Sequence, residues 1–117
     1  TEIYTLSLHD ALPISSSANQ EDHVSMGTIA ARKAREIMEN VRRVLSMEIM
    51  CACQGIDLRG NKGLGRGTEP VFEAVRKYIP KLTEDRPLYE DINKCEDLII
   101  NGEIIRVSET NIGVIEF

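Results

Sequence analysis

Five neighbouring polar side chains near the start of the chain have the residue types best suited to chemistry. They lie within Ser17–Gly27, SANQEDHVSMG, and are Asn19, Gln20, Glu21, Asp22 and His23. Carboxylates and imidazoles transfer protons, and amides can hold such groups in place. Glu21 is the best candidate for acid–base work or for orienting a ligand, because amides precede it and apolar sequence lies beyond. His23 could do the same work, and a purely structural helix cap is the alternative.

A long helix is predicted directly after this polar cluster. Apolar residues recur there at helical spacing, so we expect a helix from about Met26 to Gln54, with Gly55 just past its end. Within it, Val44–Cys53 reads VLSMEIMCAC and is apolar nearly all round, which is typical of a helix buried on every side. We therefore place it at the centre of a larger bundle, with a basic or hydrogen-bonding partner for Glu48.

Shorter elements follow. Thr68 is expected to cap a second helix that Pro80 ends, and a third helix is expected over Pro87–Asn101. The tail Glu103–Phe117 is compatible with a short strand or with a frayed terminus. Gly60–Gly67, GNKGLGRG, is expected to be a flexible loop, because it follows a helix and lacks the Gly-Lys-Ser/Thr ending of a phosphate loop. The predicted fold is all-α, with one long core helix followed by two shorter helices.

The first fourteen residues have a different origin from the rest in our interpretation. Thr1–Ile14, TEIYTLSLHDALPI, match codon by codon the translated end of a common short-read sequencing adapter. We expect residues 1–14 to be a translated adapter artefact and residues 15–117 to be the native part. A natural N-terminal segment is the alternative, whereas a secretory signal is disfavoured by the missing basic region and by Asp10.

Composition excludes several classes of protein. The formal charge of the whole chain is −5, and it becomes −3 without residues 1–14, which carry two acidic and no basic side chains. Mild acidity argues against a nucleic-acid binder, and no apolar run reaches the roughly 18 residues of a membrane span. Three cysteines without framework spacing indicate reduced thiols in a cytoplasmic protein. Cys51 and Cys53 point to different sides of the predicted helix, so we expect no metal there and interpret both as small core residues.

Two strings resemble one enzyme family. Asn19–His23, NQEDH, before the long helix, and Ala52–Arg59, ACQGIDLR, near its end, resemble histidine ammonia-lyases of the aromatic amino-acid lyase family. The resemblance implies that residues 15–117 are the C-terminal part of a large, mostly helical lyase domain. It also implies a homotetramer, and a substrate site in which Glu21 faces the substrate, with Gln20 and Asn19 beside it.

The same resemblance implies a reaction. Members of the family eliminate ammonia from L-histidine to give urocanate, with a methylidene-imidazolone electrophile formed from an Ala-Ser-Gly triplet. No Ala-Ser-Gly occurs in this chain. We therefore expect the electrophile to come from residues outside this chain, and the chain alone to be inactive.

Two alternatives remain open. One is an aromatic amino-acid lyase or aminomutase of the same fold with another substrate, against which Glu21 argues, because the phenylalanine-cleaving relatives carry glutamine at the equivalent place. The other is a non-catalytic helical interaction module, in which the polar cluster only caps the helix. Insolubility of the isolated chain would argue against the interaction module, because an apolar helix left exposed on every side is expected to aggregate.

Overall fold

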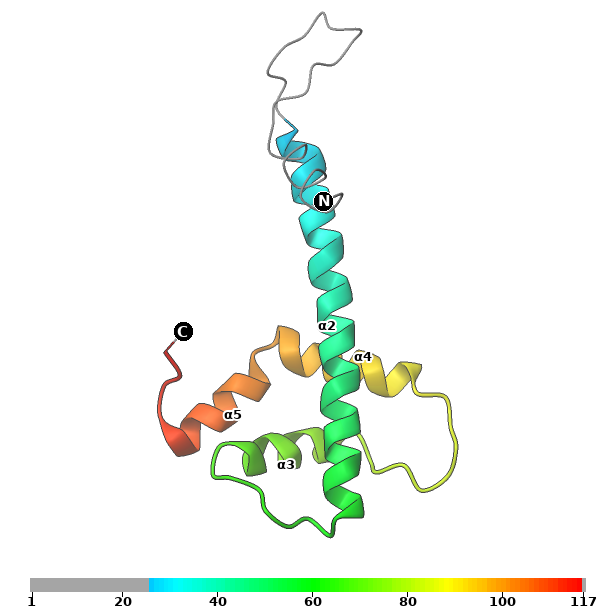
Figure 1. Cartoon of the computed structure of the whole chain (residues 1–117), viewed down its shortest axis with the longest axis vertical. Coiled ribbons are helices and arrows are strands. Elements are labelled where there is room, and N and C mark those ends of the chain that lie inside the picture. The colour runs from blue at the N-terminus through cyan, green and yellow to red at the C-terminus, as the bar shows by residue number, and fades with distance from the viewer. Residues whose placement is uncertain (1–25, 117) are drawn as a thin grey trace, which may run out of the picture. The chain divides into compact units, whose positions relative to one another are not determined.

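The computed structural model describes residues 26–116, and within that range every regular element is a helix (Figure 1). The helices are α2 (Gly27–Leu58), α3 (Thr68–Tyr78), α4 (Tyr89–Ile100) and α5 (Glu103–Ile112). The predicted all-α class is confirmed. The chain divides into two units between Glu36 and Ile37, inside α2. In the first unit the described residues, 26–36, are all exposed.

The end of α2 differs from the prediction. Gly55 lies inside the helix and not past its end, and α2 continues to Leu58. Two residues after the helix have positive φ, Gly60 at +75° and Asn61 at +56°. The amide of Asn61 donates to the carbonyl of Ile56, and the amide of Gly60 donates to that of Asp57. These two bonds form a Schellman motif, in which glycine adopts the left-handed conformation without the cost that a Cβ atom would add.

Helix α3 begins at Thr68, so the expectation that Thr68 caps this helix is wrong. Gly67 is the N-cap residue and makes no side-chain cap bond. The Thr68 hydroxyl instead binds the loop, accepting from the amide of Gly65 and donating to its carbonyl. A Cβ at Gly67 would lie 3.1 Å from Ser108 Oγ and from Ile112 Cδ1, so glycine allows α5 to approach this loop closely. The helix ends at Tyr78, two residues before Pro80, as predicted.

The tail contains a helix, so both expectations for it, strand or frayed end, are wrong. Helix α4 ends one residue before the predicted Asn101, and Gly102, at φ +69°, turns the chain into α5. The sequence of α5 is amphipathic as a helix, and Ile104 contacts the core. The long core helix is therefore followed by three shorter helices, not two.

The core of the second unit lies where one face of α2 meets α3 and α4. Its buried side chains are those of Cys53, Val75, Ile79, Cys95 and Leu98. Ser46 is fully buried beside them and donates to the carbonyl of Arg42, which satisfies its hydroxyl.

The other faces of Val44–Cys53 remain exposed in this unit. Val44 is 50% exposed and Leu45 41%, so the chain alone does not bury this helix on every side. Glu48 is also exposed, so a partner for its side chain stays a prediction. Cys51 is exposed, which corrects its assignment to the core, whereas Cys53 is buried as predicted.

In residues 26–116 we find no helix with the length and apolarity needed to cross a bilayer.

Candidate functional site

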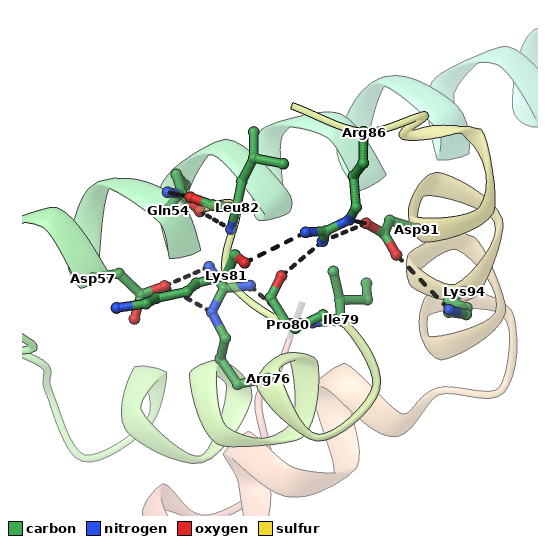
Figure 2. Close-up of polar contacts among 10 residues, drawn as sticks. All are labelled: Gln54, Asp57, Arg76, Ile79, Pro80, Lys81, Leu82, Arg86, Asp91 and Lys94. Atoms are coloured by element: carbon green, nitrogen blue, oxygen red, sulfur yellow. Dashed lines mark hydrogen bonds and ion pairs between the residues drawn. The ribbon is translucent and has the colours of Figure 1, made fainter. Parts of the chain in front are cut away.

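The predicted substrate-facing residues Asn19, Gln20 and Glu21 lie outside the described residues, as does His23. The structure therefore leaves their roles as predictions. It describes a set of polar contacts that runs from the C-terminal end of α2 to α4 in the second unit (Figure 2), and a groove beside them.

The first contact joins α2 to the segment between α3 and α4. The Gln54 amide nitrogen donates to the carbonyl of Leu82 at 2.9 Å, and its oxygen accepts from the Leu82 amide, also at 2.9 Å. One side chain thus satisfies both backbone groups of a residue outside regular structure (Figure 2). Gln54 therefore fixes the path of the α3–α4 connection across α2.

The second contact joins α2 to α3. Arg76 Nε donates to Asp57 Oδ2 at 2.8 Å, and Arg76 Nη1 donates to the carbonyl of Ile79 at 3.0 Å. Both charged side chains are largely buried, at 16% and 12% exposure. The Arg76 guanidinium also lies over the Phe72 ring, 5.6 Å from its centroid. This pair anchors the last turn of α2, which explains why α2 continues past Gly55.

The third contact closes the connection onto α4. Arg86 donates through Nε and Nη2 to Asp91 Oδ2, at 3.1 and 2.8 Å. The same guanidinium donates to the carbonyls of Pro80 and Lys81, and Lys94 Nζ lies 3.8 Å from Asp91 Oδ1. Asp91 is buried, with two cations to balance its charge. Figure 2 shows Arg86 between Asp91 and the two carbonyls, so it links α4 to the residues that end α3.

An open groove of about 270 Å³ lies between α2, the α3–α4 connection and α4, and we call it the α2–α4 groove. Carbon and sulfur atoms form most of its surface. Its lining residues are Met47, Met50, Cys51, Gln54, Arg76, Ile79, Pro80, Leu82, Arg86, Leu88, Asp91 and Ile92.

The polar contacts of the arrangement position backbone segments. Gln54, Arg86 and Asp91 bind one another or the backbone. Arg76 Nη2, in an ion pair with Asp57 Oδ2 at 2.7 Å, has no hydrogen-bond partner in the described part of the chain, and the thiol of Cys51 is exposed. Among residues 26–116, no group of three or more histidine, cysteine, aspartate or glutamate side chains could hold a metal ion.

Gln54 and Asp57 lie in the string that resembles the lyase family, but the sequence did not predict their contacts. Arg76, Arg86 and Asp91 were not predicted as functional or positioning residues. Gln54 binds a residue 28 positions away and Asp57 one 19 positions away. Local periodicity carries no signal for such pairs. In the sequence, such contacts were indicated only by Gln54 and Asp57, two polar residues at the partly apolar end of the predicted helix.

Two buried thiols, those of Cys53 and Cys95, are expected to make the stability of the second unit depend on pH in the alkaline range. Burial raises the pKa of Cys53, which the nearby Arg76 guanidinium partly counteracts, and burial also raises the pKa of Cys95. The folded chain therefore holds these protons more tightly than the unfolded chain. Their contribution to stability is complete below the ordinary thiol pKa, roughly 8.5, and is lost as pH rises through the folded values.

We expect the urea midpoint of the chain to fall as pH rises above about 8.5, and a Cys53→Ala/Cys95→Ala variant to show a shallower fall. Far-ultraviolet circular dichroism across a pH series measures both. The Cys51→Ala variant is the control, because Cys51 is exposed. An equal slope in the double variant and the wild type would remove the thiols as the cause.

Comparison with known proteins assigns the family. A profile described as "Aromatic amino acid lyase" matches residues 9–77, more than half of the chain. The histidine ammonia-lyase of Alkaliphilus oremlandii is 54% identical over 100 residues, an alignment that covers 86% of this chain and 19% of that enzyme.

Solved structures agree with this assignment. The histidine ammonia-lyase of Trypanosoma cruzi superposes with a TM-score of 0.77 at 40% identity, covering 91% of this chain and 20% of that one. The tyrosine aminomutase of Streptomyces globisporus superposes with a TM-score of 0.74 at 34% identity, covering 84% and 19%. The chain thus spans about a fifth of the length of the relatives it matches. On this evidence, the chain belongs to the aromatic amino acid lyase family.

Proposed function

We propose that this chain is part of a histidine ammonia-lyase, which eliminates ammonia from L-histidine without oxidation to give urocanate. The observation that carries the proposal is the 54% identity with the Alkaliphilus oremlandii enzyme over 100 residues. Identity with the solved tyrosine aminomutase is 34%. The family assignment also weighs against a non-catalytic interaction module.

The contribution of this chain to the reaction is selectivity for the imidazole side chain. We assign Glu21 to the substrate, with Gln20 and Asn19 orienting its carboxylate or the substrate. A carboxylate that accepts a hydrogen bond from an imidazole N–H contributes about 1.5–3 kcal/mol, or about 10- to 150-fold in affinity. A phenyl ring has no such donor and would leave the carboxylate unpaired. Glu21 therefore favours histidine over phenylalanine.

The methylidene-imidazolone ring that the family uses would supply an electrophile for the substrate amine. The residues of this chain do not fit it as a source, because the chain contains no Ala-Ser-Gly triplet. In our proposal the ring comes from residues outside these 117. The isolated chain should accordingly release no ammonia from histidine.

The assembly and location of the parent belong to the same proposal. We propose a homotetramer in the cytoplasm, with L-histidine as its ligand and no nucleic-acid or membrane partner. Exposed apolar side chains along α2, among them Ile37, Val41 and Val44, support burial in a larger assembly.

The first test reads the source DNA across the Ile14/Ser15 junction. If residues 1–14 are adapter and residues 15–117 native, the adapter codons disappear and an open frame encoding Ala-Ser-Gly continues upstream. The complete gene product should then convert L-histidine to urocanate and ammonia. A complete product that leaves histidine unchanged but acts on another aromatic amino acid would overturn the proposed substrate.

A second candidate is a tyrosine aminomutase, favoured by the superposition with the Streptomyces globisporus enzyme. The two candidates differ in their products. An aminomutase returns a rearranged amino acid that keeps its nitrogen, whereas a lyase releases ammonia. Incubating the complete protein with histidine and with tyrosine, and measuring ammonia and rearranged amino acid in parallel, separates them.

A further inference from the structure

We propose that Asn101, at the junction between α4 and α5, is a site of spontaneous deamidation whose rate is limited by release of α5 from the core. Asparagine is among the chemically labile residue types of proteins. Asn101 is the one asparagine of the chain that glycine follows. The inference does not depend on the proposed lyase function, because it concerns only residues of α4, α5 and their junction.

The reaction needs only this residue pair and water. The backbone nitrogen of Gly102 loses its proton to a base from solvent and attacks Cγ of Asn101. A bond forms between that nitrogen and Cγ, the bond from Cγ to Nδ2 breaks, and Nδ2 leaves as ammonia. Water then opens the resulting succinimide ring, which leaves aspartate or isoaspartate at position 101. Glycine has no Cβ to obstruct the attack, so the pair reacts faster than asparagine before a larger residue.

The junction is accessible to this chemistry. Asn101 is exposed, so water and base reach its side chain. A Cβ built on Gly102 would have no heavy atom of the described residues within 4 Å. The space around the attacking nitrogen therefore accommodates the succinimide ring.

The folded conformation of the junction slows the reaction. Asn101 has φ −78° and ψ −1°, so the Gly102 nitrogen eclipses the Asn101 nitrogen and points away from the Asn101 side chain. The Gly102 amide also donates to the carbonyl of Ile99 at 3.1 Å. Attack therefore requires ψ of Asn101 to rotate and this hydrogen bond to break, and the rotation displaces α5, which begins directly after Gly102.

The packing of α5 is light enough to allow this displacement. None of its residues is fully buried. Ile104 packs against the core, Ile112 lies beside Gly67, and Arg66 donates to the carbonyl of Asn111 at the surface. Segments with little buried apolar surface open locally at a low cost in free energy. The deamidation rate at Asn101 therefore follows how often α5 leaves the core.

The product changes the junction. A new carboxylate at position 101 lies at the C-terminal end of α4, where the helix dipole disfavours negative charge. Isoaspartate also inserts an additional methylene group into the backbone between the two helices. Both changes weaken the attachment of α5, so the modification limits the lifetime of this part of the fold.

The experiment incubates the complete protein at neutral pH and follows each asparagine by peptide mass spectrometry. Asn61 and Asn93 are internal controls, because both are exposed but precede lysine. We expect Asn101 to convert at least about tenfold faster than either, since the lysine side chain obstructs the attack. Chromatography of the Asn101 peptide should yield isoaspartate together with aspartate. Equal rates at the three positions, or aspartate without isoaspartate, would overturn the proposal.

A matched pair of variants tests the role of α5. Ile104→Ala removes the side chain that packs against the core, and Ile105→Ala makes the same change at a neighbour that is 46% exposed. Neither variant alters the Asn101–Gly102 pair. We expect Ile104→Ala to raise the rate at Asn101 by about 5- to 30-fold, because Ile104 is only partly buried, and Ile105→Ala to leave it unchanged. Equal rates in the two variants would show that release of α5 does not limit the reaction. The comparison among asparagines uses the wild type, so it stands even if Ile104→Ala fails to fold.

Discussion

We expect Glu21→Gln to lower kcat/KM for histidine in the complete lyase by about 5- to 12-fold. The substitution keeps the size of the side chain and a hydrogen-bond acceptor, but it removes the negative charge. A neutral amide forms a weaker bond to an imidazole N–H than a carboxylate does, by about 1–1.5 kcal/mol. Steady-state kinetics with histidine, together with the melting temperature of the variant, measures the effect.

The matched control for this variant is Glu84→Gln. Glu84 is exposed in the connection between α3 and α4, and the same change there removes the same charge. We expect histidine turnover of Glu84→Gln to equal that of the wild type. If Glu21→Gln also kept wild-type turnover at an unchanged melting temperature, Glu21 would have no role in recognising the substrate.

The selectivity between histidine and phenylalanine gives a second measurement on the Glu21→Gln variant. Loss of the charge removes the cost of leaving a carboxylate unpaired beside a phenyl ring. We therefore expect the ratio of histidine to phenylalanine turnover to fall in Glu21→Gln. A uniform loss with both substrates would indicate disturbed folding of the site.

Asp91→Asn is expected to lower the free energy of unfolding of the chain by about 2–3 kcal/mol. Breaking a buried ion pair commonly costs more, but the Arg86 side chain is 32% exposed and keeps its bonds to two backbone carbonyls. Solvent therefore screens part of the loss. Because Asp91 holds Arg86, and Arg86 holds the residues that end α3, the variant should loosen the connection between α3 and α4. Urea unfolding followed by circular dichroism measures the change.

Glu103→Gln is the control for Asp91→Asn. Glu103 also accepts hydrogen bonds from an arginine, three of them from Arg106, but this pair lies at the surface, where the Arg106 side chain is 67% exposed. Water replaces such a contact readily, so we expect an almost unchanged urea midpoint. Similar midpoints for the two variants would show that burial adds nothing to the Arg86–Asp91 pair.

Helix periodicity predicted three of the four described helices, and the errors fall where tertiary contacts override local preference. Gly55 was expected to end α2 because glycine disfavours helix interiors by about 1 kcal/mol. The contacts of Gln54 and Asp57 with the α3–α4 connection and with α3 hold the last turn together and outweigh that cost. The helix then ends at Leu58, and Gly60, two residues later, adopts the left-handed conformation that the turn needs.

The tail shows the same limit. The β-branched residues between Glu103 and Phe117 suggested a strand or a frayed end, although the sequence of α5 is amphipathic as a helix. Packing supports the helix, because Ile104 contacts the core and α5 approaches Gly67. An amphipathic helix forms when a neighbouring surface accepts its apolar face.

The sequence by itself determined the helical class, the position of the long helix, the family resemblance and the candidate carboxylate Glu21. All of these depend on residues that are close together in the chain, where periodicity and short strings carry information. Only the tertiary structure decided which face of α2 is buried, where α2 ends, and which polar side chains pair. Gln54 meets Leu82 across 28 residues and Asp57 meets Arg76 across 19. Such contacts depend on the path of the intervening chain, which no local pattern specifies.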